Sequence, residues 1–513
     1  MKQLAFNSWE GKLILTATII ASGMAFLDGT VVNIAVPVIQ KDLQTTIAGI
    51  QWIINSYALL MAAFILISGS LGDRFGRKRI FSYGIGIFVL CSLLCSLARD
   101  INQLILFRSL QGLGAAMMIP GSLSIINTTF EEKVRGKVIG LWSGFAGGIA
   151  SLGPFLGGWL VQTFGWQSIF YLNIPLGLIA LFITLRYIPE SKNDDVKSLD
   201  IGGTFLLFLG LLGISYALIE APVLGFTNSL VVGAFFLSIL ALVSFIFQEK
   251  KAKEPLVPFR IFNSPLVIGA NLVTLSLYFA LTSIIFFFIL NLQQLQHYSP
   301  LIAGLGMLPS ILIITFLSGY GGSLSDKIGP RIPMILGPLL VSFGMASLLF
   351  AGVKANYFIS FLPGLVLSGL GMSLVIAPLT KSALAVDSRY SGAASGVNNA
   401  TSRIAALLAI ALLGAIMAFT FSSQLTKLVS TSHLSSTQQH SIIQQKDKIG
   451  AVQIPNTFLP QEKQIAQHAV ENAFLFAFRV VIGISAALAF LSAVLSFFFI
   501  KPKPKAHLTA TQT

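Results

Sequence analysis

The chain has 513 residues, of which 55% are hydrophobic and only 10% are charged. A soluble protein carries about 25% charged residues, so a soluble body of this size could not cover its surface with so few charges. The composition therefore places the chain in a membrane. The net charge of +14 does not indicate nucleic-acid binding, because the basic residues form no stripe interleaved with aromatic side chains. Cys91 and Cys95 lie in one apolar run, which excludes a disulfide framework or a zinc ribbon.

Fourteen apolar runs approach the length of about 20 residues that a helix needs to cross a bilayer. The first run is too long for the apolar region of a signal peptide and is expected to be the first span. The seventh and eighth runs are the weakest, and a twelve-span alternative would have to absorb them. We expect an all-α integral membrane protein with spans at residues 13–36, 50–71, 79–98, 103–127, 137–161, 168–188, 201–220, 229–248, 265–290, 302–323, 331–352, 356–380, 400–422 and 473–500.

The basic residues test this number of spans. With the N-terminus in the cytoplasm, 24 Lys and Arg residues fall on the inner side, including Arg403 at the start of the thirteenth span, and 7 fall outside. Such a split is a strong positive-inside signal, and an odd error in the number of spans would scramble it. We therefore expect a multi-pass protein of the plasma (inner) membrane with both termini in the cytoplasm.

Two sequence echoes indicate duplicated halves. Residues 69–79 read GSLGDRFGRKR and residues 322–331 read GSLSDKIGPR, at an offset of 253. A second echo, Gly112-Leu113-Gly114 followed by Pro120, recurs at 369–371 with Pro378, at an offset of 257 to 258. Repeated halves of this kind are typical of transporters.

These echoes predict two six-helix bundles with two inserted helices between them. The expected parts are an N-terminal bundle (1–190), the inserted helices with their linkers (191–260), a C-terminal bundle (261–500) and a basic cytoplasmic tail (501–513). Residues 423–472 are rich in Ser, Thr, Gln and Lys and fall outside. We expect a flexible external loop there, and a partner-docking element is the alternative.

The motifs resemble those of the major facilitator superfamily. The sequence GSLGDRFGRKR at 69–79 resembles its motif A, FRSLQG at 107–112 resembles motif B, and GPFLGG at 153–158 resembles the antiporter motif C. The sequence LDGTVVNIAVP at 27–37 resembles the signature of the fourteen-span drug:proton antiporters. The second copy of motif A departs from the pattern at Ser325 and Pro330, which weakens any role assigned to it.

Asp28 is the candidate proton carrier. The sequence has no phosphate-binding loop for ATP, so uphill transport would need an ion gradient rather than a cofactor. An acid at the centre of a spanning helix costs about 2.5–3.5 kcal/mol and normally marks function. Asp28 lies nine residues inside Pro37, and Arg108 lies eight residues inside Asp100, so both sit ~12–13 Å from the outer edge. A contact between them is expected, with Gln111 one turn further on; the resemblance implicates the motif B arginine in proton coupling. The alternatives are a fixed ion pair and an Arg108 satisfied by backbone carbonyls.

Motif A supplies the candidate inner gate. A carboxylate at a helix junction can cap a neighbouring helix and pair with Arg or Lys. The resemblance implies that Gly72, Asp73, Arg74 and Arg77 act in this way, with Asp326 as the counterpart in the second half. The alternative is a tight loop whose basic residues only fix the topology.

The glycines of the fifth span recur every four residues, which is typical of close helix packing. We expect Gly144, Gly148, Gly153 and Gly157, with Gly140, to form one such stripe, and Pro154 to kink the helix. Packing alone explains this pattern. Only the resemblance to motif C adds export by exchange.

The substrate cavity is expected between the halves near the midplane. We expect a proton-coupled exporter of amphipathic or lipophilic drugs; the alternative is a dedicated exporter of a native metabolite such as a siderophore or amino acid. A membrane enzyme or receptor is disfavoured, because no nucleophile–His–acid set or metal cluster lies at membrane depth. The expected partners are the substrate, protons and the lipid bilayer, with a monomeric chain; the sequence identifies no periplasmic adaptor protein. Candidate cavity residues are Phe26, Asn33, Trp52, Asn55, Tyr57, Asn398 and Asn399.

Overall fold

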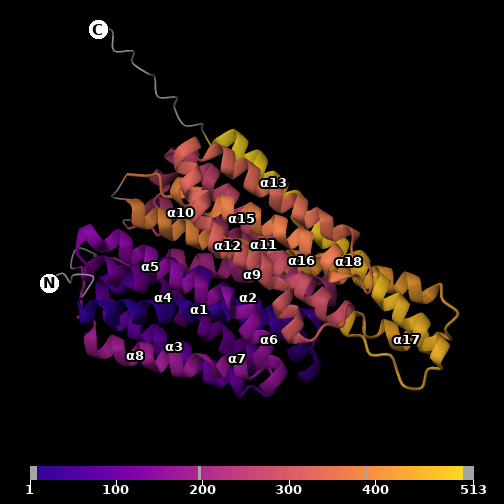
Figure 1. Ribbon diagram of the computed structural model, residues 1–513. Coiled ribbons are helices and arrows are strands. Elements are labelled where there is room, and N and C mark those ends of the chain that lie inside the picture. The colour runs from indigo at the N-terminus through magenta and orange to yellow at the C-terminus, as the bar shows by residue number, and fades with distance from the viewer. Residues whose placement is uncertain (1–7, 194–197, 253, 388–389, 501–513) are drawn as a thin grey trace, which may run out of the picture.

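The computed structural model describes residues 8–193, 198–252, 254–387 and 390–500. Within these ranges, fourteen helices are long and apolar enough to cross a membrane, as the hydropathy pattern predicted. The predicted basic tail at 501–513 lies outside the described residues. Figure 1 shows the helices as one elongated bundle, with the first half of the chain along one side and the second half along the other.

The N-terminal half contains six spans, two of which are interrupted. Its helices are α1 (Trp9–Asp42), α2 (Ile47–Phe75), α3 (Arg77–Ser96), α4 (Ile101–Thr129), α5 (Glu132–Ser151) continued by α6 (Gly153–Phe164), and α7 (Ser168–Tyr171) continued by α8 (Asn173–Tyr187).

Two further helices, α9 (Ile201–Leu224) and α10 (Ser229–Lys251), follow the first six spans and precede the last six, at the position where the sequence predicted two inserted helices. They pack against each other, and α9 also contacts α2 and α16. A hydrogen bond of 2.8 Å from Trp52 Nε1 to Glu220 Oε1 joins α2 to α9. The inserted pair therefore lies against one side of the seam between the halves.

The C-terminal half supplies the remaining six spans. After a short 3-10 helix, η1 (Phe259–Asn263), they are α11 (Pro265–Leu290) with the π-helix η2 (Asn291–Leu295), α12 (Pro300–Ile328), α13 (Arg331–Ser347) with η3 (Leu348–Phe350), α14 (Tyr357–Ser360) followed by α15 (Leu362–Ala383), α16 (Ser391–Ser430) and α18 (Pro460–Phe499).

The expectation of a flexible loop at 423–472 is wrong. α16 and α18 extend beyond the predicted spans, and between them lie α17 (Ser436–Ile443) and the 3-10 helix η5 (Lys446–Ala451). Ile442 and Ile449 are fully buried. Figure 1 shows this segment projecting from one end of the bundle, which we call the α17 end. Hydropathy missed it because the helices continue through polar residues outside the apolar runs.

The two halves are packed together unequally along the bundle. The largest buried cluster contains residues of both halves, such as Val36 and Ile39 of α1 with Phe287 and Leu292 of α11 and η2. The second cluster belongs to the other end of the N-terminal half and contains a single residue of the C-terminal half, Ala400. We call that end, where α2 meets α3, the motif A end.

Candidate functional site

Asp28 and Arg108 form an ion pair in the interior of the N-terminal half, at the similar depth that their positions indicated. Their side chains are 0% and 1% exposed. Gln111 Nε2 donates to Asp28 Oδ1 at 3.0 Å, and Arg108 donates to Gln111 Oε1 at 2.7 Å. α4 can approach α2 this closely because residue 112 is Gly: an added Cβ would lie 2.2 Å from the backbone oxygen of Tyr57.

Three further residues complete this network: Asn173 and Ser92, which were not predicted, and Tyr57, which was predicted only as a cavity residue. Asn173 Nδ2 donates to Asp28 Oδ1 at 3.1 Å and to Ser92 Oγ at 3.0 Å. The Tyr57 ring lies 4.3 Å from the Arg108 guanidinium carbon, and Tyr57 Oη donates to the carbonyl of Ala25 at 3.0 Å. A buried ion pair needs such additional hydrogen bonds to offset its desolvation. The search for ionisable groups missed Asn173; the available signal was a polar residue two positions before Pro175 in an apolar run.

A central cavity of about 450 Å³ lies beside this network, between the halves. Tyr57 and Arg108 separate it from Asp28, which does not line it. Three of the candidate cavity residues are in its wall, namely Phe26, Asn33 and Tyr57. Its opposite wall includes Tyr278, Thr282 and Arg403, which the cavity predictions had omitted.

The other four candidates lie elsewhere. Trp52 binds Glu220 of α9. Asn55 is fully buried, and its amide has no hydrogen-bond partner among the described residues. Asn398 Nδ2 donates to Thr274 Oγ1 at 2.8 Å, and Asn399 Nδ2 donates to the carbonyl of Ser395 at 3.0 Å. These contacts give all but Asn55 a structural role in or between helices.

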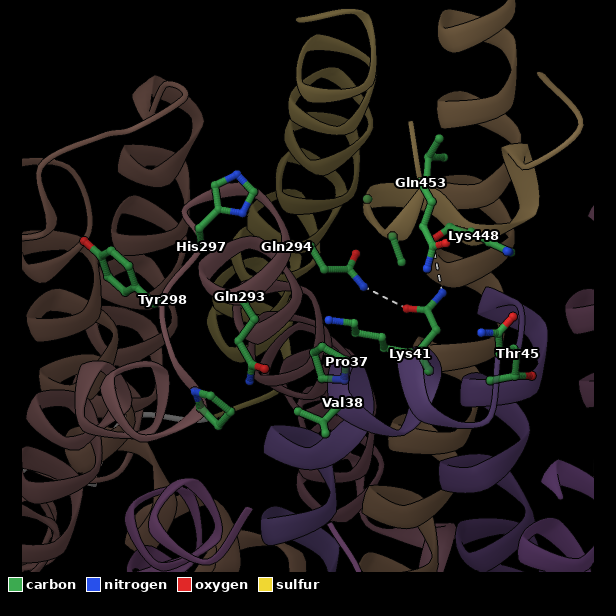
Figure 2. A pocket seen from close by; sticks show the side chains of 16 residues that line it. Pro37, Val38, Lys41, Thr45, Gln293, Gln294, His297, Tyr298, Lys448 and Gln453 are labelled. Carbon is green, nitrogen blue, oxygen red and sulfur yellow. Dashed lines mark hydrogen bonds between the residues drawn. The ribbon is translucent and has the colours of Figure 1, made fainter. Parts of the chain in front are cut away.

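Polar contacts between the halves close the α17 end of the cavity. Gln294 Nε2 donates to Gln40 Oε1 at 2.7 Å, and Gln40 Nε2 donates to the carbonyl of Lys448 at 3.0 Å. Figure 2 shows this chain of side chains crossing from α1 to η2 and η5. Nearby, Gln51 Nε2 donates to the carbonyl of Ile410 at 2.6 Å. A vestibule of about 520 Å³ adjoins these contacts and is lined by Gln40, Gln294 and Lys448 themselves.

The glycine stripe of the fifth span does not pack along its whole length. Gly153 and Gly157 face α1, where an added Cβ would lie 2.0 Å from Thr30 Oγ1 and 2.5 Å from Val31 Cγ2. Pro154 and Gly304 bring α6 and α12 equally close. By contrast, a Cβ at Gly140, Gly144 or Gly148 would meet no atom within 4 Å. The expected stripe is therefore wrong for α5 in this state.

The helix of this span is interrupted at Leu152, two residues before Pro154, where the sequence predicted a kink. α5 ends at Ser151, α6 begins at Gly153, and Pro154 occupies the first turn of α6. Proline is tolerated there because that N–H has no partner within a helix. The glycine face of α5 thus meets no neighbouring atom, whereas α6 is packed closely against α1 and α12. Contacts between the halves are therefore concentrated toward the α17 end of the central cavity.

In motif A, Asp73 pairs with a residue of its own half. Arg77 Nε donates to Asp73 Oδ1 at 2.8 Å, and the Arg74 guanidinium lies 5.4 Å from the Phe75 ring. In the second half, Asp326 pairs with Lys381 at 2.7 Å, and both side chains are exposed. Both predicted gating acids are therefore paired within their own halves.

The cap of α3 is Glu190 rather than Asp73. Glu190 accepts hydrogen bonds from the backbone N–H groups of Lys78 and Arg79 at 3.0 and 3.2 Å. Gly76 between the helices has φ 113°, a left-handed conformation that favours glycine, and an added Cβ there would lie 2.7 Å from the Glu190 carboxyl. Gly72 accepts the N–H of Gly76 through its carbonyl. The junction is a compact turn held by the segment after α8.

The geometry agrees with the comparisons to known proteins. The family model described as Major Facilitator Superfamily matches residues 18–410. The chain belongs to the major facilitator superfamily.

Curated members of this superfamily resemble the chain over most of its length. It is 33% identical over 415 residues to the multidrug resistance protein Stp of Mycobacterium tuberculosis (strain CDC 1551 / Oshkosh), covering 80% of this chain and 77% of that protein. It is 30% identical over 501 residues to the tetracenomycin C resistance and export protein of Streptomyces glaucescens, covering 96% and 92%. The family resemblance found in the sequence motifs is therefore confirmed, and the family consists of transporters rather than enzymes.

Solved structures of the superfamily share the fold. A bacterial homologue of the human lysosomal transporter Spinster, in an inward-facing and unoccupied conformation, aligns with a TM-score of 0.65 at 18% identity. The alignment covers 97% of this chain and 99% of that one. The inward-open xylose transporter XylE from E. coli aligns with a TM-score of 0.57 at 14% identity, covering 96% and 98%. The predicted major facilitator fold is confirmed.

Proposed function

We propose that this protein is a proton-coupled antiporter that exports amphipathic drug-like molecules across the plasma membrane. The observation that carries the proposal is the buried Asp28–Arg108 pair, which lies directly behind a central cavity whose α17 end is crossed by hydrogen bonds between the halves. Several relatives are named for drug or antibiotic resistance, which supports export as the direction of transport. The excess of basic residues in the loops at the motif A end supports a cytoplasmic location for that end.

Asp28 is the proton carrier in this proposal. When its carboxyl is ionised, it accepts hydrogen bonds from Arg108, Gln111 and Asn173. Protonation removes the charge that holds Arg108, so the contact between α1 and α4 changes with each proton that binds. α1 also carries Gln40, which joins the halves at the α17 end, and Thr30 and Val31, which pack against α6. A change at Asp28 can thereby reach the contacts that close the outer end.

The cycle then follows alternating access. In the state described here, substrate enters the cavity from the cytoplasmic side while the α17 end is shut. Breaking the Gln40–Gln294–Lys448 contacts opens the outer end, where substrate leaves and a proton reaches Asp28. Return to the present state delivers the proton to the cytoplasm.

The test is transport in proteoliposomes under an imposed pH gradient. Asp28→Asn is expected to abolish gradient-driven accumulation of substrate while equilibrium exchange of substrate survives. Removing one partner of a buried ion pair leaves an uncompensated charge and can destabilise a protein. The double variant Asp28→Asn/Arg108→Gln, which leaves no lone buried cation, should therefore be measured beside it.

The matched control is Asp100→Asn. Asp100 caps α4 at its outer end, where asparagine is an equally good cap. This variant should pump like the wild type. Undiminished pumping by both Asp28 variants would remove Asp28 from the mechanism.

A further inference from the structure

Arg403 is a cation in the wall of the central cavity that lacks a counter-charge. The sequence pattern placed it at the cytoplasmic start of a span, but α16 continues as one helix through this position, and Arg403 reaches the ring of Phe26, 5.5 Å from its guanidinium carbon. Phe26 is two residues from Asp28, so Arg403 lies at the depth of the proton site. Nε of Arg403 is buried and has no hydrogen-bond partner among the described residues.

The two guanidinium groups of the cavity differ in this respect. Arg108 is fully committed to Asp28, Gln111 and the face of Tyr57. Arg403 makes neither a hydrogen bond nor an ion pair with any described residue. Its guanidinium lies over the Phe26 ring, and Tyr57 and Tyr278 line the same cavity. Arg403 is part-buried, and its guanidinium lies in the cavity wall without a counter-charge. A partly desolvated, unpaired cation is stabilised by an anionic partner, so this guanidinium points to an anionic group on the ligand.

The cavity has, among its described residues, no comparable binding group for a cationic ligand. The described residues that line it include no Asp or Glu. Asp28, the nearest acid, is fully buried behind Arg108 and Tyr57, and both of its oxygens accept hydrogen bonds from neighbouring side chains. A lipophilic cation in the cavity would therefore meet the positive field of Arg403 without a free carboxylate to bind.

We propose that the substrates are amphipathic organic anions, aromatic or aliphatic molecules whose carboxylate or phenolate binds Arg403. This inference rests on the export function proposed above and names its substrate class. The guanidinium presents paired N–H donors that match a carboxylate, and the aromatic residues Phe26, Tyr57 and Tyr278 supply apolar surface for the rest of the molecule.

The proposal also separates the substrate from the proton. Arg403 is on α16 in the C-terminal half, whereas Asp28 and Arg108 are on α1 and α4 in the N-terminal half, and no hydrogen bond joins Arg403 to their network in the described residues. Substrate and proton therefore occupy different groups rather than competing for one carboxyl. Their exchange depends on the alternation of the halves, so loss of Asp28 should spare binding and loss of Arg403 should spare the proton.

The experiment compares two dyes that share a xanthene ring system and differ in charge, anionic fluorescein and cationic rhodamine 123. Binding to the purified protein in nanodiscs is measured by fluorescence polarisation, and accumulation is measured in proteoliposomes with an imposed pH gradient. The variants are Arg403→Gln and Arg403→Lys. The control is Arg479→Gln, because Arg479 donates to the carbonyl of Ala351 at the α17 end, away from the cavity.

The wild type should bind fluorescein more tightly than rhodamine 123. Charge-assisted hydrogen bonds are strong enough that Arg403→Gln should weaken fluorescein binding on the order of tenfold or more. Arg403→Lys should retain part of the affinity, Arg479→Gln should retain all of it, and rhodamine binding should be unchanged or improved in Arg403→Gln. A thermal unfolding curve for each variant separates loss of the fold from loss of the site.

The inference is overturned if the wild type binds rhodamine 123 more tightly than fluorescein. It is also overturned if Arg403→Gln leaves fluorescein binding unchanged. Neither result bears on export, which the pH-gradient arm decides. Fluorescein binding through Arg403 without gradient-driven accumulation would contradict the antiporter function and leave the anion site standing. If rhodamine 123 is pumped by the pH gradient and Arg403→Gln does not change its pumping, the anion site is contradicted and the antiporter function is supported.

Discussion

Asn173 donates a hydrogen bond to the Asp28 carboxylate from the break between α7 and α8. Asn173 is the first residue of α8, and Ser92 Oγ accepts its second amide hydrogen at 3.0 Å. The sixth span therefore contacts the proton site directly, although it contributes no charge to it. Asn173 is in this sense a positioning residue for Asp28.

Replacing Asn173 by Ala should slow gradient-driven transport without abolishing it. A hydrogen bond to a charged group is worth about 1.5–3 kcal/mol, so we expect a fall on the order of tenfold in the pumping rate. Initial rates in proteoliposomes measure this, with substrate binding in nanodiscs as the second readout. Asn228→Ser is the control, because it exchanges one α10 cap for another of similar quality. A rate equal to that of the wild type would show that Asn173 does not support the ionised carboxyl.

Loss of the Gln294 side chain should favour opening of the α17 end. Its amide joins η2 of the C-terminal half to Gln40 of the N-terminal half at 2.7 Å. A neutral hydrogen bond contributes about 0.5–1.5 kcal/mol, so Gln294→Ala should raise the open-to-closed ratio about 2- to 12-fold. Spin labels at Thr45 of the N-terminal half and Gln453 of the C-terminal half, which both line the vestibule, would report the distribution of distances between the halves at this end. An unchanged distance distribution would mean that the Gln294–Gln40 hydrogen bond forms when the α17 end closes but does not stabilise the closed state.

The close approach of α6 and α12 makes a sharper test of the same closure. An added Cβ at Gly304 would lie 2.1 Å from the backbone oxygen of Pro154, and backbone cannot move aside cheaply. Gly304→Ala should therefore disfavour the state closed at the α17 end and lower transport strongly, with little loss of expression. Gly86→Ala on α3 is the control, since nothing lies within 4 Å of that position. Equal transport by the two variants would contradict a tight α6–α12 contact in the working cycle.

The fold could be predicted from the sequence because a spanning segment must satisfy its backbone hydrogen bonds within a helix and present apolar side chains to the lipid. Fourteen apolar runs of the required length are visible in the sequence, and fourteen helices in the described part of the chain match them. The Asp28–Arg108 contact followed from depth along two helices of known rise. Asn173 and Arg403 could not be found in this way. Asn173 carries no charge, and Arg403 lies at the edge of an apolar run, where hydropathy cannot tell a loop from a helix that continues inward.

The glycines of the fifth span show a second limit. Their spacing is the same at Gly140, Gly144 and Gly148 as at Gly153 and Gly157, but only the latter pair is packed. A periodic pattern reports that a helix face can pack, whereas the state of the transporter decides where it does. The polar segment around α17 was missed for a related reason, since helices outside the bilayer need no apolar run.

Asp73 provides the test of the inner gate. In the present state its carboxylate pairs with Arg77 at 2.7 Å, and the two side chains are 32% and 15% exposed. A pair this accessible to solvent contributes no more than about 1 kcal/mol. If Asp73 acted only through this ion pair, losing the pair should therefore change the turnover rate by about fivefold at most. If, as we propose, Asp73 acts as an inner gate that makes a further contact when the motif A end closes, Asp73→Asn should slow turnover by more than this, with little change in substrate affinity. Arg77→Gln removes the same ion pair while leaving the carboxylate in place and is the matched comparison. An equal and modest fall in turnover in both variants would mean that motif A only stabilises the turn between α2 and α3. A much larger loss in Asp73→Asn would identify Asp73 itself as the group that closes the cytoplasmic side.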